Sequence, residues 1–172
     1  MIRKAIEADI PAIADIYART LALEDKEKRT GWLKDIYPVE ATARAALERG
    51  DLYVYCENGR ILATAIINQT QVDVYSMGAW SSPTPDSEVS VIHTLAVDPD
   101  EYGKGIAKAF LTFYEDEARK AGMKALRLDT NAINKKARAM YKALGYTEIG
   151  AVPCVFNGIP DVKLVLIEKL LT

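Results

Sequence analysis

The stretch that decides the fold runs from His93 to Ala109 and reads HTLAVDPDEYGKGIAKA. Its first half belongs to a β-branched and apolar run, Ser90 to Val97, that stops at an Asp-Pro pair and is typical of a strand. From Ile106 to Ala121, apolar residues recur at helical spacing. Between strand and helix, Gly103 and Gly105 allow a tight turn whose backbone N–H groups can approach a ligand closely.

This loop predicts a site for a phosphate or a pyrophosphate. The first N–H groups of a helix have no partner within the helix, and the helix dipole favours an anion there. Lys104 adds a point charge between the glycines. The loop is not a Walker loop, because no Gly-Lys-Ser/Thr follows, and the third glycine of a dinucleotide fingerprint is missing. Taken alone, the two glycines fit a ligand-free turn equally well.

A second motif follows about thirty residues later. Asn134 is expected to cap a helix in which Ala137, Met140, Tyr141 and Leu144 share one face. A Gly-Tyr pair at positions 145–146 ends this helix.

The two motifs together resemble the GCN5-related N-acetyltransferase (GNAT) family over roughly the last half of the chain. The resemblance implies an acetyl-CoA-dependent N-acetyltransferase, with acetyl-CoA as co-substrate and its pyrophosphate on the glycine loop. Tyr102 stands where the family usually has Arg or Gln, so one side-chain contact departs from the pattern. The resemblance assigns coenzyme binding to Leu95, Ala96, Val97, Tyr102, Gly103, Lys104, Gly105, Ile106, Ala107 and Asn134.

Two residues are candidates for catalysis. By resemblance, Tyr141 protonates the leaving thiolate, a task that suits a phenol; otherwise it is a core aromatic residue. His93, the only histidine, is a candidate base for the acceptor ammonium because its ordinary pKa lies near neutrality. Glu88, a carboxylate elsewhere or a chain of waters are alternatives, and a lone strand histidine is often structural. No metal site is expected, and direct attack by the amine needs no covalent intermediate.

The whole chain predicts one α/β domain over residues 1–172. We expect a mixed, mostly antiparallel sheet of six to seven strands flanked by helices. The resemblance adds a splayed central strand pair, whose free backbone groups near Leu95 and Val97 pair with the pantetheine arm. The expected strands are Ile2–Ala5, Leu52–Cys56, Ile61–Asn68, Ser90–Val97, Lys124–Asp129, Tyr146–Ile149 and Val162–Ile167. The expected helices begin at an Asp9 N-cap, at Glu40, at Gly105 and at Asn134.

Two segments allow alternative interpretations. Leu21 to Tyr37, which contains Trp32, forms either a wall of the acceptor pocket or a loop anchored to the core. Gln69 to Ser87 is long and irregular, which is often a functional feature. It either borders the acceptor pocket or extends the preceding strand with a disordered tip.

Composition excludes several classes of protein. A net charge of −2 argues against broad nucleic-acid binding, so an anion site must be locally basic. Lys104, Lys108, Lys135, Lys136 and Arg138 supply such charge, unless they are simply solvated. Two cysteines make no disulfide framework, and no signal peptide or membrane-spanning run is visible, so we expect a cytoplasmic protein.

The acceptor is not readable from the sequence. We expect a small-molecule amine or a peptide amine as substrate, no nucleic-acid or membrane partner, and a possible homodimer by resemblance. The alternative function is a non-catalytic module that binds or senses acyl-CoA, and a weaker one is a nucleotide-binding domain.

Overall fold

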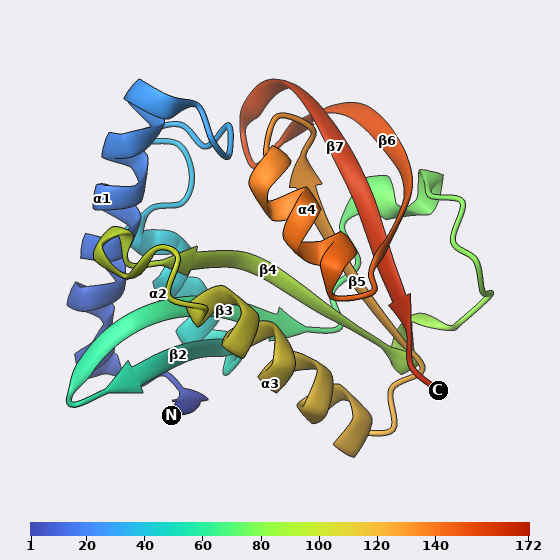
Figure 1. Ribbon diagram of the computed structural model, residues 1–172, viewed down its shortest axis with the longest axis horizontal. Helices are drawn as coiled ribbons and strands as arrows, with labels where there is room; N and C mark the ends of the chain where they lie inside the picture. Colours follow the sequence, from blue (N-terminus) through green and yellow to red (C-terminus); the bar gives the residue numbers. More distant parts are fainter.

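The computed structural model describes the backbone of residues 1–172 and every side chain except that of Asp25. Seven strands form one sheet in the order β1-β2-β3-β4-β5-β7-β6, and only β4 and β5 run parallel (Figure 1). The expected mixed, mostly antiparallel α/β sheet is therefore confirmed. The strands are β1 (Ile2–Lys4), β2 (Leu52–Glu57), β3 (Arg60–Asn68), β4 (Val89–Val97), β5 (Ala125–Asn131), β6 (Thr147–Phe156) and β7 (Ile159–Leu170).

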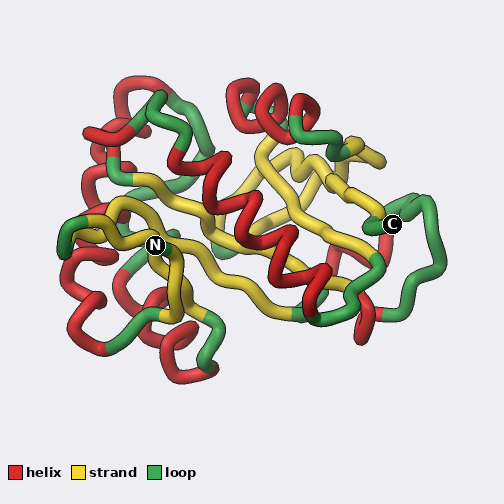
Figure 2. The backbone as a smooth tube through the Cα atoms, turned by 60° about the horizontal axis from the view of Figure 1, so that its bottom comes forward, coloured by secondary structure: helices red, strands yellow, loops and turns green.

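Helices cover both faces of the sheet, because each has one apolar side to bury. They are α1 (Ile10–Glu27), α2 (Glu40–Arg49), α3 (Ile106–Lys120) and α4 (Lys135–Ala143). On one face, α1 and α2 bury residues such as Ile13 and Ala43 against Leu52. On the other, α3 and α4 bury Phe110 and Tyr141 among sheet residues. Figure 2 shows the long α3 crossing its face of the sheet.

The two last strands are longer than the sequence pattern predicts. They form one hairpin through an Asn157-Gly158 turn with φ of +50° and +78°, and pair from Thr147 opposite Glu168 to Phe156 opposite Ile159. The prediction ended the first strand too early, before Pro153. Proline is tolerated there because β6 is the edge strand of the sheet.

The local signals for helix ends are confirmed with one exception. The Asn134 side chain accepts a hydrogen bond from the N–H of Ala137 at 3.3 Å, as expected of an N-cap. Asp9 does not cap α1. Its carboxylate accepts from the N–H of Ile6 at 2.9 Å and pairs with Arg3 at 2.7 Å, so it closes a short 3-10 turn that precedes the helix.

The central strands separate after a short contact. β4 and β5 pair only from Val89 opposite Ala125 to Val91 opposite Arg127. Beyond this point β4 stays with β3 and β5 stays with β7, so the expected splay is present. The hydroxyl of buried Tyr114 on α3 donates to the carbonyl oxygen of Ser90 at 2.5 Å and lies 3.3 Å from the carbonyl oxygen of Arg127. It thus supplies a hydrogen-bond donor to the backbone carbonyl groups at the point where β4 and β5 separate.

The segment from 69 to 88 packs on the sheet and does not extend β3. It contains 3-10 turns at Asp73–Met77 and Asp86–Glu88. The indole of Trp80 donates to the carbonyl of Tyr75 at 2.7 Å, and the guanidinium of Arg127 lies 4.1 Å from the Trp80 ring centroid. This packing buries Tyr75 beside β5. Within the described part of the chain, we find no helix with both the length and the apolar character that crossing a bilayer requires.

Candidate active site

A cleft of about 520 Å³ lies where β4 and β5 separate. Its walls come from both strands, from α1, α3 and α4, from the loop between α1 and α2, and from the β6–β7 hairpin. In the described residues, no group of three His, Cys, Asp or Glu side chains has the proximity that a metal ion requires.

The predicted coenzyme-binding residues converge on this cleft. Gly103 and Gly105 have φ of +79° and +81°, a conformation that glycine adopts without strain. In the described chain, no hydrogen bond occupies the N–H groups of these glycines or of Ile106 and Ala107. Nine of the ten predicted positions line the cleft: Leu95, Ala96, Val97, Tyr102, Gly103, Gly105, Ile106, Ala107 and Asn134.

Lys104 is the exception among these ten. It is absent from the cleft lining, and its ammonium pairs with the carboxylate of Glu101 at 3.0 Å. Of the other candidate cations, Lys108 and Lys136 line the cleft, whereas Arg138 pairs with Glu148 at 2.7 Å. The local positive charge therefore comes from the first turns of α3 and α4.

A further cation reaches this end of the cleft from the α1–α2 loop. The guanidinium of Arg29 lies 4.6 Å from the centroid of the Tyr102 ring, and both residues line the cleft. Cation–π attraction favours this stacking. Arg29, whose Nε also contacts a carboxylate oxygen of Glu27 at 3.3 Å, thus brings a guanidinium beside Tyr102.

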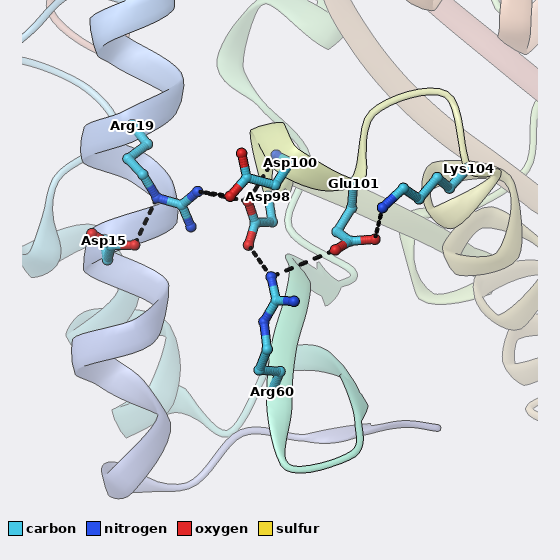
Figure 3. Close-up of polar contacts among 7 residues, drawn as sticks. All are labelled: Asp15, Arg19, Arg60, Asp98, Asp100, Glu101 and Lys104. Atoms are coloured by element: carbon cyan, nitrogen blue, oxygen red, sulfur yellow. Dashed lines mark hydrogen bonds and ion pairs between the residues drawn. The ribbon is translucent and has the colours of Figure 1, made fainter.

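Buried Asp98 ties the glycine loop to the body of the protein (Figure 3). One oxygen contacts Arg19 of α1 at 2.7 Å and the other contacts Arg60 of β3 at 3.1 Å. The same carboxylate accepts from the N–H of Asp100 at 3.0 Å. The Arg19 hydrogen bond is the main cause that lowers the pKa of Asp98. Asp98 therefore stays ionised and holds three elements together.

The candidate acid, Tyr141, is 8% exposed and lines the cleft. Its ring packs edge-on against Tyr146 at 5.9 Å. Burial, and then the nearby charge of Asp129, raise the pKa of its hydroxyl well above the ordinary value. Among the described residues its hydroxyl makes no hydrogen bond, so it is available as a donor in the cleft that Tyr141 lines.

The candidate base, His93, lies on β4 and its imidazole Nε2 is 2.9 Å from the side-chain oxygen of Asn68. Burial lowers the pKa of His93 to about 4. The imidazole is therefore neutral near pH 7 and a weak proton acceptor.

Asp129 on β5 is a residue that sequence reasoning did not single out. It lines the cleft, and the hydroxyl of Tyr75 donates to its Oδ2 at 2.7 Å. Burial raises the pKa of Asp129 to about 6. The only signal in the sequence is a carboxylate at the end of an apolar strand, which does not reveal that the strand borders a splay.

The α1–α2 loop closes one end of the cleft. The hydroxyl of Tyr37 hydrogen-bonds to the hydroxyl of Thr94, the residue at a bulge in β4 with φ of +51°. Trp32 and Tyr37 both line the cleft, so this loop is anchored to the core and forms a wall at the same time. Figure 1 shows the loop after α1 reaching the tip of the β6–β7 hairpin.

Comparisons with known proteins agree with this geometry. The Acetyltransferase (GNAT) family matches residues 14–146. An N-acetyltransferase of Methanocaldococcus jannaschii is 38% identical over 69 residues, which are 40% of this chain and 30% of that protein. The [ribosomal protein bS18]-alanine N-acetyltransferase of Escherichia coli K12 is 31% identical over 106 residues, 60% of this chain and 61% of that protein. The matched segments thus span less than two thirds of these two relatives.

Other relatives match over more of their length. The L-amino acid N-acyltransferase MnaT of Escherichia coli K12 is 27% identical over 163 residues, 90% of this chain and 83% of that protein. An acetyltransferase of Salmonella typhimurium, solved with acetyl-CoA, has a TM-score of 0.72 at 21% identity and covers 100% of this chain and 94% of its own. An N-acetyltransferase of Staphylococcus aureus Mu50 has a TM-score of 0.74 at 20% identity, and the match covers 100% of this chain and 98% of that one. The family match extends over most of the chain, and the protein belongs to the GNAT family of acetyltransferases.

Proposed function

We propose that this protein transfers an acetyl group from acetyl-CoA to a primary amine, by direct attack of the amine on the thioester. The observation that carries the proposal is one cleft that combines three features. It has a cradle of free N–H groups at Gly103, Gly105, Ile106 and Ala107, a carboxylate with a raised pKa at Asp129, and a free phenol at Tyr141.

The residues at the glycine loop fit the coenzyme. Free N–H groups at the start of α3 suit a pyrophosphate, and the positive charges of Lys108, Lys136 and Arg29 favour it further. The backbone of β4 beyond Val91 has lost its β5 partner, so its groups are available to the pantetheine amides. Acetyl-CoA supplies the reactive thioester at this site.

Two side chains then transfer protons, one as a general base and one as a general acid. Asp129 accepts the proton of the acceptor ammonium, whose nitrogen forms the new C–N bond as the C–S bond breaks. N–H groups of the splayed β4 stabilise the negative charge that develops on the acyl oxygen. Tyr141 donates its proton to the departing thiolate, a role for which a phenol that stays protonated at neutral pH is suited.

We assign the base to Asp129 in preference to His93. A pKa of about 6 leaves Asp129 ionised at pH 7 and still a useful acceptor, whereas a pKa of about 4 makes His93 a weaker one. His93 also already contacts Asn68. The names of the relatives, a ribosomal-protein alanine N-acetyltransferase and an L-amino acid N-acyltransferase, support an amine acceptor in general.

The test is acetyl transfer measured with a panel of primary amines. We expect Asp129→Asn and Tyr141→Phe each to lower kcat by ~100-fold or more, with little change in acetyl-CoA affinity. In the wild type, kcat should rise with pH through about 6 and then level off, and this rise should vanish in Asp129→Asn.

Tyr146→Phe is the matched control for Tyr141→Phe, since Tyr146 packs on Tyr141 but does not line the cleft. It should keep full kcat. Acetyl-CoA binding without turnover of any amine would instead favour the non-catalytic acyl-CoA-binding module.

A further inference from the structure

The two ends of the cleft differ in charge. The cations in its lining are Arg29, Lys108 and Lys136. Arg29 stacks on Tyr102, and the two lysines lie in the first turns of α3 and α4, so all three flank the glycine loop. The end beyond Asp129 is lined mainly by apolar side chains, namely Trp32, Val72, Phe156, Ile159, Val162 and Leu164.

The polar groups of this end are amides and carboxylates, and its hydroxyls at Tyr37 and Thr94 are bonded to each other. The amides are those of Asn131 and Asn157. The carboxylates are those of Asp129 and of Glu24, which accepts hydrogen bonds from the N–H groups of Thr30 and Gly31 at 2.7 and 3.1 Å. Among the side chains described at this end, none is a guanidinium or an ammonium. Arg49 and Arg127 lie outside the lining: Arg49 pairs with Asp51 at 2.9 Å, and Arg127 stacks on Trp80.

We propose that the acceptor is a primary amine on a compact apolar frame, aromatic or branched, with no carboxylate on the carbon that bears the amine. This rests on the proposed acetyl transfer and names its substrate class. The ammonium pairs with Asp129, while the apolar side chains hold the frame; the second carboxylate, Glu24, is occupied by the N–H groups of Thr30 and Gly31. A carboxylate beside the amine would enter a desolvated site next to a like charge and without a cationic partner.

The closure of this end favours a small acceptor over a polypeptide. A Cβ at Gly31 would lie 2.3 Å from the side-chain nitrogen of Asn131, so the α1–α2 loop presses on the end of β5. A Cβ at Gly158 would lie 3.3 Å from Ile36, so the same loop contacts the β6–β7 turn. Donor and acceptor must also share about 520 Å³.

The first experiment compares acceptors that differ in one group. With acetyl-CoA saturating, kcat/KM is measured for phenethylamine, L-phenylalanine, L-phenylalaninamide and a tripeptide with N-terminal phenylalanine. We expect phenethylamine to exceed L-phenylalanine by at least tenfold, the amide to stay within a few-fold of phenethylamine, and the tripeptide to be poor. Equal or better turnover of L-phenylalanine or of the tripeptide would overturn the assignment, and so would an amide as poor as the amino acid.

The second experiment adds the missing cation. Phe156→Arg places a guanidinium in the apolar end, because Phe156 lines the cleft. The control is Val155→Arg, which adds the same group at the adjacent position, where the side chain is 70% exposed and outside the lining. Only Phe156→Arg should shift the ratio of L-phenylalanine to phenethylamine turnover, by at least tenfold toward the amino acid. An equal shift in both variants, or in neither, contradicts the proposal. Wild-type transfer to amino acids alone would refute the acceptor class and leave acetyl transfer intact, whereas no acetyl-CoA binding would refute both.

Discussion

At the scale of single residues, the carboxyl group of Asp129 connects stability with chemistry. Its pKa is raised from 3.8 to about 6 because burial disfavours the ionised form, while the Tyr75 hydrogen bond acts in the opposite direction. Because the pKa of Asp129 is higher in the folded state than in the unfolded state, this group stabilises the fold when the pH lies below the unfolded-state pKa of 3.8. This stabilisation is lost as the pH rises through the folded-state pKa of about 6. At neutral pH, the ionised Asp129 is therefore destabilising, as is often found for functional groups.

Tyr75→Phe tests the hydrogen bond to Asp129. Without the donor, the ionised carboxylate loses support and the pKa of Asp129 should rise further above 6. The rise of kcat with pH should therefore move to higher pH, with an unchanged plateau, as measured by a pH–rate profile. The control is Tyr55→Phe on β2, since the described Tyr55 side chain makes no hydrogen bond to Asp129. This variant should have the same pH–rate profile as the wild type. An unmoved profile in Tyr75→Phe would show that this bond does not tune the base.

At the scale of elements, the loop between β4 and α3 depends on Asp98. Asp98→Asn would leave Arg19 and Arg60 without their shared anion and loosen the loop that precedes Gly103. We expect a loss of about 1–3 kcal/mol in the free energy of unfolding and a weaker affinity for acetyl-CoA, with kcat at saturation nearly unchanged. Thermal unfolding and steady-state kinetics measure the two effects.

The pH dependence of this contribution follows from the lowered pKa of Asp98. Because the pKa of Asp98 is lower in the folded state, its carboxylate stabilises the fold when the pH lies above the unfolded-state pKa of 3.8. The stabilisation is lost as the pH falls through the lower folded-state pKa. The difference in unfolding free energy between wild type and Asp98→Asn should thus be full at pH 7 and shrink below about pH 4. A constant difference down to pH 2 would contradict the role of the ionised carboxylate.

The α1–α2 loop contributes Arg29 to the glycine-loop end of the cleft. If this end holds the phosphates as proposed, Arg29→Gln should weaken the binding of acetyl-CoA by about tenfold, a change of ~1.4 kcal/mol, because a guanidinium that can contact a phosphate is lost. Binding of S-acetylpantetheine, which has no phosphate, should not change. Arg44→Gln makes the same change in charge on α2, where Arg44 pairs with Glu7 and Glu40, and should affect neither ligand. Equal loss for both ligands in Arg29→Gln would indicate a distorted loop instead.

At the scale of the whole molecule, the sheet consists of two parts that share three residue pairs. Strands β1 to β4 form one part and β5, β7 and β6 form the other, with the Tyr114 hydroxyl at the junction. A ligand that binds in the splay would contact both parts and would therefore stabilise them together.

Thermal unfolding with acetyl-CoA measures this effect. At about a hundred times its Kd, acetyl-CoA should stabilise the protein by roughly 2.7 kcal/mol, which corresponds to several degrees in Tm for a domain of this size. ATP at the same concentration is the control and should produce a much smaller shift, since it lacks the arm that fills the splay. An equal shift with ATP would favour the nucleotide-binding alternative.

The sequence by itself determined most of the elements and the position of the glycine loop. The Asn-Gly turn at positions 58–59, the Asn134 cap and the glycines of the loop act through neighbours within a few residues, and each lies where the pattern predicted. The error at Asp9 is also local, because its carboxylate accepts from the N–H of Ile6, three residues earlier, and not from the first turn of α1. The β6 prediction ended too early because an edge strand accepts a proline that a central strand does not.

Only the tertiary structure decided which side chains share the cleft. Asp129 meets Tyr75 across 54 positions of the chain, and Tyr37 meets Thr94 across 57. Arg29 reaches Tyr102, and Lys104 turns away to Glu101. These contacts depend on the order of strands and on the splay of β4 from β5, which bring distant segments together. Proximity of this kind also raises the pKa of Asp129, because the burial that shifts it comes from the packed fold and not from its neighbours in the chain.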